Sequence, residues 1–352
     1  MRKLIGLLAV VLAPLAWADD VLHVYNWNDY IPSDTIERFE SECGCKVVYD
    51  TYGSNEEMLA KLAAGATGYD ILVPTDYAVT TLVKQGKLMV LDKGQLPNLK
   101  NIAPQFMDRP FDPGNRYSVP YAFGSTLLGF NQAKMKDLEI PTDSWAALFE
   151  PRYLERIKGK VTVLDDQREL MGAALIYLGY SANDTDPQHW QQAVDLLVKA
   201  KPYWAAFNST SYIRLLAAGD IWLAHGYSMD MFQAAEAAQE AGRGVTVAYA
   251  IPKEGAIMGM DNLVIHKDAP RPDLAHRFIN FILEPQNAAA LSNELGVGNP
   301  NGAALKYVDP EIVKDPALFP DPERLARMEN IEELSAEQRR RLNRLWTEVK
   351  VR

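Results

Sequence analysis

Aromatic side chains follow two strand-like segments of the chain. Trp27 and Tyr30 come after Val21–Asn26, and Tyr77 comes after Tyr69–Pro74. Ligands of open α/β sheets gather at the carboxyl ends of strands, so we expect these rings to face a ligand. A flat ring suits a methylene chain and adds about 0.5–2 kcal/mol to the binding of a cation. The alternative for each ring is ordinary packing.

Carboxylates occupy comparable positions. Asp166 and Glu169 lie three residues apart where the strand-like segment Gly159–Leu164 gives way to a helix, and Asp261 precedes the strand-like Asn262–Ile265. A carboxylate at ~4 Å from an ammonium group contributes about 4 kcal/mol at an effective dielectric constant of ~20. The alternative for Asp166 and Glu169 is helix capping, and for Asp261 a turn. On these residues alone, capping is the better interpretation of Asp166, while the acidic composition of the chain suits a cationic ligand.

The sequence offers little for other chemistry. The formal net charge of −10 argues against nucleic acid as a partner. No zinc-binding, nucleophile-elbow or phosphate-loop motif occurs, and we expect no metal and no cofactor. The run Arg339–Arg341 fits the solvated face of a helix. The absence of catalytic motifs makes an enzyme a minor alternative.

The first 18 residues resemble a secretory signal peptide. Arg2 and Lys3 precede the apolar run Leu4–Ala13, and Ala16-Trp17-Ala18 supplies the small residues of a cleavage site. The apolar run is shorter than the ~20 residues that span a bilayer, and no lipobox cysteine follows it. We therefore expect a periplasmic protein without a membrane anchor.

Strand-like and helical segments alternate, which predicts an α/β fold with a mostly parallel sheet. The segment Ser54–Glu57 predicts a capping box that opens a helix, and Ser335–Gln338 begins the last amphipathic helix. Tyr117–Asn131 is strand-like but interrupted by Pro and Gly, and it predicts a crossover between lobes. The remaining predicted strands are Lys46–Asp50 and Val245–Ala250, and the remaining predicted helices are residues 34–39, 77–84, 168–178, 189–199, 274–283 and 286–295.

Cys43 and Cys45 are the only two cysteines, separated by Gly44. An oxidising compartment allows a disulfide, although a bridge across one residue would be tight. The alternative is two thiols, with Cys43 at a helix end and Cys45 at the start of a buried strand. The residues alone leave both open.

Several segments, in order along almost the whole mature chain, resemble the spermidine/putrescine-binding proteins of ABC transporters. They include residues 25–32, 46–50, 54–56, 69–74, 110–121, 178–183, 205–209, 251–255 and 278–282. The resemblance implies a type II periplasmic binding protein fold, in which two α/β lobes joined by crossover hinge strands close over a ligand cleft. It also implies a monomer that delivers a polyamine or diamine to an inner-membrane ABC permease.

The resemblance places crossovers near residues 123–130, 252–258 and 300–306. The N-terminal lobe would then comprise residues 19–124 and 257–302. The C-terminal lobe would comprise residues 125–256 and 303–352.

The resemblance also implies which residues contact the ligand. Besides the rings and acids above, these include Tyr227 and Asp230, which match an aromatic-x-x-Asp pattern, and Thr75, which stands where the family usually has serine. The full expected set is Trp27, Asn28, Tyr30, Thr75, Tyr77, Asp166, Glu169, Tyr227, Asp230 and Asp261.

Three positions depart from the family pattern. Gly259 stands where an aromatic residue is expected, Val297 replaces a tyrosine, and Ile331 roughly aligns with a glutamine that contacts spermidine in some members. We expect the missing rings to weaken the binding of common polyamines or to favour a differently shaped amine, and Gly259→Trp to tighten it where the ring has room. An ω-amino acid such as 4-aminobutyrate is the alternative ligand, but the matching positions show no obvious basic partner for its carboxylate.

Overall fold

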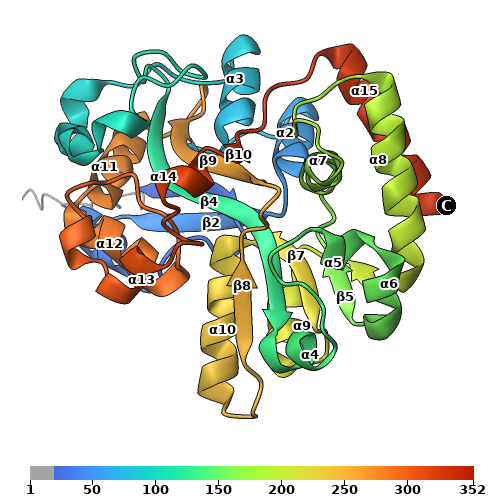
Figure 1. Cartoon of the computed structure of the whole chain (residues 1–352). Coiled ribbons are helices and arrows are strands. Elements are labelled where there is room, and N and C mark those ends of the chain that lie inside the picture. Colours follow the sequence, from blue (N-terminus) through green and yellow to red (C-terminus); the bar gives the residue numbers. More distant parts are fainter. Residues whose placement is uncertain (1–19) are drawn as a thin grey trace, which may run out of the picture.

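The computed structural model describes residues 20–352 and consists of two α/β halves side by side (Figure 1). Hydrogen-bonded strands run in the order β2-β1-β3-β9-β4-β7-β5-β6, with β10 beside β9 and β8 beside β4. The signal peptide predicted for residues 1–18 lies outside the described residues. This arrangement agrees with the type II binding protein fold expected from the sequence. The sheet is mixed and not mostly parallel as predicted, because β4 and β9 pair antiparallel with neighbouring strands.

The first half contains the sheet β2-β1-β3-β9-β4. Strand β1 pairs in parallel with β2 and β3, whereas β9 is antiparallel to β3 and β4. The strands are β1 (Val21–Trp27), β2 (Lys46–Tyr52), β3 (Ile71–Leu72), β4 (Ser118–Asn131) and β9 (Ala256–Ile265). The helices that pack around it are α1 (Thr35–Cys43), α2 (Asn55–Ala63), α3 (Asp76–Lys84), α11 (Pro272–Ile282) and α12 (Pro285–Leu295).

The second half uses the far end of β4. Strand β5 is parallel to β6 and β7, and β4 is antiparallel to β7 and β8. Its strands are β5 (Val161–Val163), β6 (Ala206–Phe207), β7 (Leu223–Tyr227) and β8 (Val247–Ala250). Its helices are α4 (Gln132–Asp137), α5 (Ala146–Phe149), α6 (Pro151–Leu154), α7 (Gln167–Tyr177), α8 (Pro187–Ala200), α9 (Tyr212–Ala218), α10 (Ser228–Ala241) and α15 (Ala336–Val351).

The long strands β4 and β9 pass between the halves, as Figure 1 shows. Strand β4 contacts β9 through residues 118–125 and β7 through residues 126–130, so one strand belongs to both sheets. The crossover expected at residues 117–131 is therefore present. The short strand β10 (Met328–Glu329) pairs with Ala256 and Ile257 at the start of β9. Helices α13 (Pro310–Lys314) and α14 (Pro322–Leu325) precede it.

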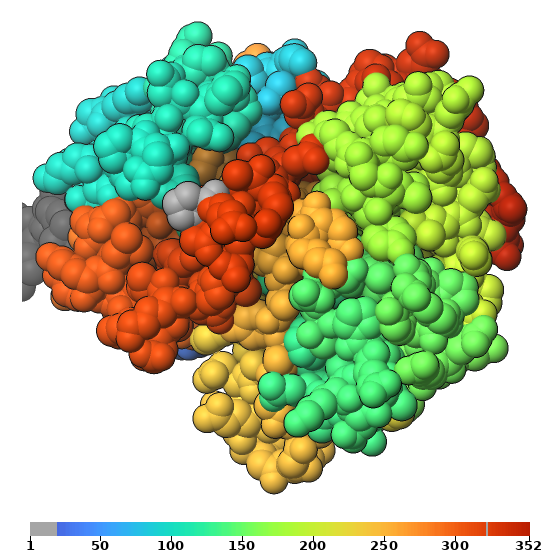
Figure 2. Space-filling model, in the orientation of Figure 1, coloured from blue at the N-terminus to red at the C-terminus, as the bar shows by residue number. Residues whose placement is uncertain are grey.

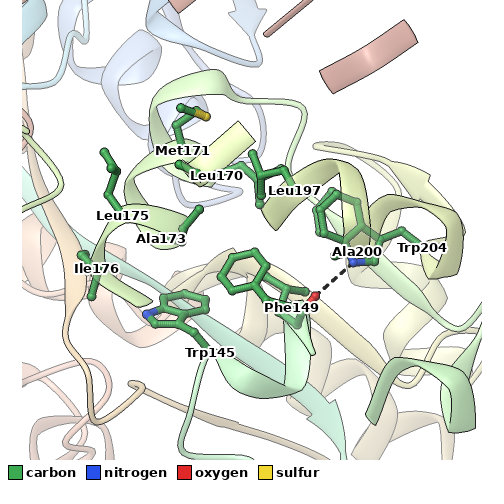
Figure 3. Packing of buried hydrophobic residues seen from close by; sticks show 14 of the residues in the cluster. Trp145, Phe149, Leu170, Met171, Ala173, Leu175, Ile176, Leu197, Ala200 and Trp204 are labelled. Atoms are coloured by element: carbon green, nitrogen blue, oxygen red, sulfur yellow. Dashed lines mark hydrogen bonds between the residues drawn. The ribbon is translucent and has the colours of Figure 1, made fainter. Parts of the chain in front are cut away.

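Each half has its own apolar core. In the second half, Trp145 and Phe149 lie against the apolar face of α7, and Trp204 Nε1 donates to the Leu148 carbonyl at 3.2 Å (Figure 3). The buried indole thus keeps its polar atom satisfied while its ring adds apolar area. In the first half, Phe39 of α1 packs edge-on against Phe278 of α11. Two separate cores are what allow two lobes to form on one chain.

Three local predictions need correction. Strand β3 is shorter than the predicted Tyr69–Pro74, because the Val73 carbonyl accepts from Trp27 Nε1 at 2.9 Å and from Tyr52 Oη at 2.6 Å instead of joining the ladder. Only half of the capping box at Ser54 forms. The Ser54 hydroxyl accepts from Glu57 N, but the Glu57 carboxylate bonds Gly53 N. Strand β8 begins at Val247 instead of Val245.

Cys43 and Cys45 form a disulfide in the structure, with Cα atoms 5.2 Å apart. Gly44 between them has φ +66° and caps the C-terminus of α1. A residue with this backbone is best a glycine, because a Cβ disfavours positive φ. The bridge therefore fastens the end of α1 to the start of β2.

Candidate functional site

One cavity of about 340 Å³ lies between the two halves, and all ten residues expected to contact a ligand line it. The carboxyl ends of four strands supply most of them. Trp27 ends β1, Thr75 follows β3, Asp166 follows β5 and Tyr227 ends β7. Because β1 and β3 are parallel, and β5 and β7 are parallel, each sheet directs its strand ends to the cavity. The sequence pattern of polar or aromatic residues just past strand ends thus placed the cavity.

Asp261 is held in the cavity by hydrogen bonds to both of its carboxylate oxygens. Its two carboxylate oxygens accept hydrogen bonds from the Tyr30 hydroxyl at 2.8 Å and the Thr75 hydroxyl at 2.7 Å. Asn55 holds Thr75 in turn, donating to its hydroxyl at 2.9 Å. Burial raises the pKa of Asp261 to about 6, even though these hydrogen bonds favour the charged form. A buried carboxylate in this state gains from a cationic partner.

Asp230 lies near the start of helix α10. Its carboxylate accepts a hydrogen bond from the Tyr212 hydroxyl, and this hydroxyl also accepts from the backbone N–H of Tyr227 at 3.3 Å. Burial raises the pKa of Asp230 to about 7, and the nearby carboxylate of Asp29 adds to the effect. Tyr212 therefore orients an acid that forms no ion pair within residues 20–352.

Asp166 and Glu169 form a second acidic group on α7. Asp166 is the N-cap of α7, so the helix-capping alternative stated for it is confirmed. Its Oδ1 accepts from the N–H groups of Arg168 and Glu169 at 2.8 and 3.1 Å. Glu169 accepts from the Thr126 hydroxyl. Burial, and then the proximity of Asp166, raises the pKa of Glu169 to about 8. Capping uses one oxygen of Asp166, so the cap and a role at the cavity are compatible.

Aromatic rings line the same cavity as the acids. Trp27 packs on Tyr52 with ring centroids 4.8 Å apart, and its N–H is fixed by Val73. The Tyr77 hydroxyl donates to Glu56 at 3.1 Å. Tyr227 also lines the cavity. These fixed rings offer apolar faces for a hydrocarbon chain between charged ends.

Sequence reasoning missed three charged residues of the cavity lining, Asp29, Asp76 and Arg168. Asp29 has φ +49°, a conformation that an aspartate adopts at little cost. Arg168 lies between Asp166 and Glu169 in the sequence. Its position between two expected ligand contacts could have indicated that it also lines the cavity. The expectation that no basic residue lies near the matching positions was wrong.

Arg168 is 8% exposed, donates to the Glu332 carbonyl at 2.9 Å and lies 5.6 Å from the centre of the Tyr77 ring. The charge balance of the described lining nevertheless favours cations. Arg168 is its single basic side chain, and it faces six acids: Asp29, Asp76, Asp166, Glu169, Asp230 and Asp261.

The three positions that depart from the family pattern, Gly259, Val297 and Ile331, also line the cavity. A Cβ atom at Gly259 would lie 3.0 Å from Cγ2 of Thr75, which is closer than ordinary contact. A tryptophan at this position would therefore have to move the Thr75 methyl group. We no longer expect this single change to tighten binding.

A two-lobed α/β fold with an acid-lined cavity between its lobes defines a solute-binding protein. Residues 34–320 match the model of the bacterial extracellular solute-binding protein family, and the chain belongs to this family. Members of the family are receptors and not enzymes, which confirms the expectation of a receptor.

The relatives agree with this assignment. The chain is 53% identical over 354 residues to a putrescine/cadaverine-binding protein of Pseudomonas aeruginosa, covering all of both chains. It is 37% identical to the putrescine-binding periplasmic protein PotF of Escherichia coli, covering 98% of this chain and 95% of PotF. A solved spermidine/putrescine ABC transporter protein from Listeria monocytogenes superposes with a TM-score of 0.86 at 38% identity, covering 95% of this chain and 99% of that one. The resemblance found in the sequence is thus confirmed.

Within residues 20–352, no helix combines the length and the apolar content needed to cross a bilayer.

Proposed function

We propose that this protein is a periplasmic receptor that captures a diamine or polyamine of the putrescine or spermidine kind and delivers it to an inner-membrane ABC importer. The observation that carries the proposal is the composition of the cavity lining. It contains six acids and several aromatic rings but only one basic side chain among the described residues, Arg168. Relatives at 53% and 37% identity are named for putrescine binding. The ten expected residues are the proposed ligand contacts.

The acids fall into two groups, which suits a ligand with two charged ends. Asp261 and Asp230 lie near Tyr30, because after burial their charges are among the causes that raise its pKa. Asp166 and Glu169 lie near Tyr227, whose pKa is raised by burial and then by these two acids. Each group would hold one ammonium, because burying an ammonium without a counter-charge is prohibitive. The aromatic faces would hold the methylenes.

Isothermal titration calorimetry tests the proposal. Putrescine, cadaverine and spermidine should bind with a 1:1 stoichiometry, whereas glutamate and glucose should give no heat of binding. Binding of none of the three amines would remove the proposed function.

An ω-amino acid is the second candidate, and Arg168 is the observation that favours it, since a guanidinium pairs well with a carboxylate. A titration with 4-aminobutyrate distinguishes the two. Tighter binding of 4-aminobutyrate than of putrescine, lost in Arg168→Gln, would select the amino acid. We expect the reverse order because acids outnumber the one base.

The lobe boundaries, the monomeric state and cleavage after Ala18 are further parts of the proposal. From the sequence, the lobes would comprise residues 19–124 with 257–302, and residues 125–256 with 303–352, and we propose one change to these bounds. Residues 304–318 pack against α12 of the first lobe through Ala304, Val308, Ile312 and Leu318. This packing favours a third connection beyond Leu318 instead of near residues 300–306.

A further inference from the structure

A second, larger cavity lies directly behind the first. Its volume is about 870 Å³, and it shares four lining residues with the ligand cavity, namely Asp76, Tyr77, Met258 and Ile331. We call it the rear cavity. Figure 2 shows a hollow between the teal segment 104–111 and the orange-red segment 319–333, which supply much of its wall. The two cavities are therefore separated by the thickness of single side chains.

The shared wall is closed by one amide. Asn330 donates through Nδ2 to Asp76 Oδ2 at 2.8 Å and to the Met258 carbonyl at 3.1 Å. The other oxygen of Asp76 accepts from the N–H of Tyr77 at 2.8 Å. If a cation replaced Asn330 at Asp76, Asn330 would keep Met258 as an acceptor. Opening the wall would thus leave no buried polar group without a partner.

Asp76 is 4% exposed and has no cationic partner within ion-pair distance among the described residues. Burial raises its pKa to about 7, and Asp261 adds to the rise, whereas Arg109 lowers the pKa. A buried carboxylate of this kind is stabilised by an arriving ammonium group.

The rear cavity suits an alkyl chain that carries positive charge. Its apolar wall contains Phe106, Phe111, Phe123, Phe319, Met258 and Met260. Its lining contains four acids, Asp76, Glu329, Glu332 and Glu333, and two basic residues, Lys84 and Arg109. Lys84 is already paired with Glu333. The balance remains acidic.

We propose that Asp76 and the rear cavity form an extension of the ligand site that accepts the outer aminoalkyl arm of a triamine. The arm passes Met258 and Ile331, and its terminal ammonium takes the place of the Asn330 amide at Asp76. A four-carbon diamine ends between the two acid groups of the first cavity and does not reach Asp76. This inference rests on the proposed function and adds a subsite for longer ligands.

Calorimetry with putrescine and spermidine on wild type and Asp76→Asn tests the subsite. Asp76→Asn retains an oxygen that accepts from Tyr77 N, so the helix start is preserved. We expect its affinity for spermidine to fall about tenfold or more, as when one partner of a buried charge pair is removed. Its affinity for putrescine should fall much less, because Asp76 belongs to neither of the two acid groups that would hold the diamine. Glu329→Gln is the control, since Glu329 lines the same cavity but is bonded to Ser181.

A steric variant provides an independent test. Thr80 lines the rear cavity and not the ligand cavity. Thr80→Phe should weaken spermidine selectively, whereas Thr80→Val, which keeps the side-chain size, should not. The subsite would be overturned if the variants weakened both amines equally, or if neither Asp76→Asn nor Thr80→Phe affected spermidine. Neither result would count against the proposed function as a diamine receptor. Loss of putrescine binding by the wild type would instead contradict the proposed function.

Discussion

A Cβ atom built on Gly259 lies 3.0 Å from Thr75 Cγ2, so any side chain at position 259 would press on the methyl group of Thr75. An isolated antiparallel bridge pairs Thr75 with Asp261, two residues after Gly259 on β9. Thr75 also holds Asp261 through its hydroxyl at 2.7 Å. Gly259 and Thr75 therefore pack against each other beside Asp261. A larger side chain at position 259 would shift Thr75 and with it the hydrogen bond to Asp261.

This relationship predicts opposite results for a single and a double variant. Gly259→Trp alone should weaken putrescine binding about tenfold, because it displaces Thr75 from Asp261, and overpacking typically costs ~1–3 kcal/mol. Thr75→Ser together with Gly259→Trp removes the methyl, keeps the hydroxyl and adds a stacking face, so it should bind at least as tightly as wild type. Thr75→Ser alone is the control. Calorimetric Kd values give the answer, and a single variant that binds more tightly than the double variant would contradict the packing argument.

Asp261 should matter for binding and not for folding. Asp261→Asn should weaken diamine binding by about 2–5 kcal/mol, the loss expected when one partner of a buried charge pair is removed. The unliganded variant should melt at the same or a higher temperature, because burial already disfavours the charged carboxylate. Calorimetry and thermal unfolding measure the two effects. Glu311→Gln, on an exposed ion pair, is the control, and an unchanged affinity in Asp261→Asn would exclude Asp261 from the site.

The sequence predicted much of the fold because its signals are local. Strands β1, β2 and β4 were found within two residues at each end, since their apolar runs end at turn residues. Helices α9 and α10 were not predicted. Helix α10 is rich in alanine, as in Ala234, Ala235, Ala237 and Ala238. Its sequence therefore does not divide clearly into an apolar and a polar face. The missed helix carries Asp230, so its place in the site came only from the family resemblance.

The site was predictable where a residue follows a strand and hidden where it depends on packing. Trp27 and Asp166 follow strand ends, which is a sequence signal. Asp76 was missed because its surroundings are set by distant parts of the chain, such as Asn330, which donates to its carboxylate from 254 positions away. No pattern near Asp76 distinguishes it from an ordinary first-turn acid of a helix.

Secretion can be checked directly. Full-length precursor expressed with its own first 18 residues should yield periplasmic protein whose intact mass begins at Asp19, because Ala16-Trp17-Ala18 fits a cleavage site. Ala18→Pro should block processing and serves as the matched control. A membrane fraction that retains residues 1–18 in the wild type would contradict this prediction.

The raised carboxylate pKa values predict how ligand binding depends on pH. Burial raises the pKa of Asp261 to about 6, of Asp230 to about 7 and of Glu169 to about 8. Such groups stabilise the unliganded fold below their unfolded pKa of ~4, and this contribution is lost as the pH rises through 6 to 8. A bound ammonium favours the ionised carboxylates, so an amine should bind more tightly at pH 8 than at pH 5.5 and should release protons on binding at pH 7.

The ligand-dependent rise in melting temperature is the quantity to measure. Buried His225, whose pKa burial lowers to about 3, affects the stability of the unliganded protein in the opposite direction as the pH falls, and it cancels in this difference. With putrescine at a fixed concentration, the rise should be larger at pH 8 than at pH 5.5. Titrations at pH 7 in phosphate and in Tris, which differ in ionisation enthalpy, should show proton release, and Asp230→Asn should release fewer protons than wild type. No proton release and equal thermal shifts at the two pH values would mean that the acids of the cavity are already ionised before the amine arrives. Proton uptake, or a larger thermal shift at pH 5.5, would contradict the prediction.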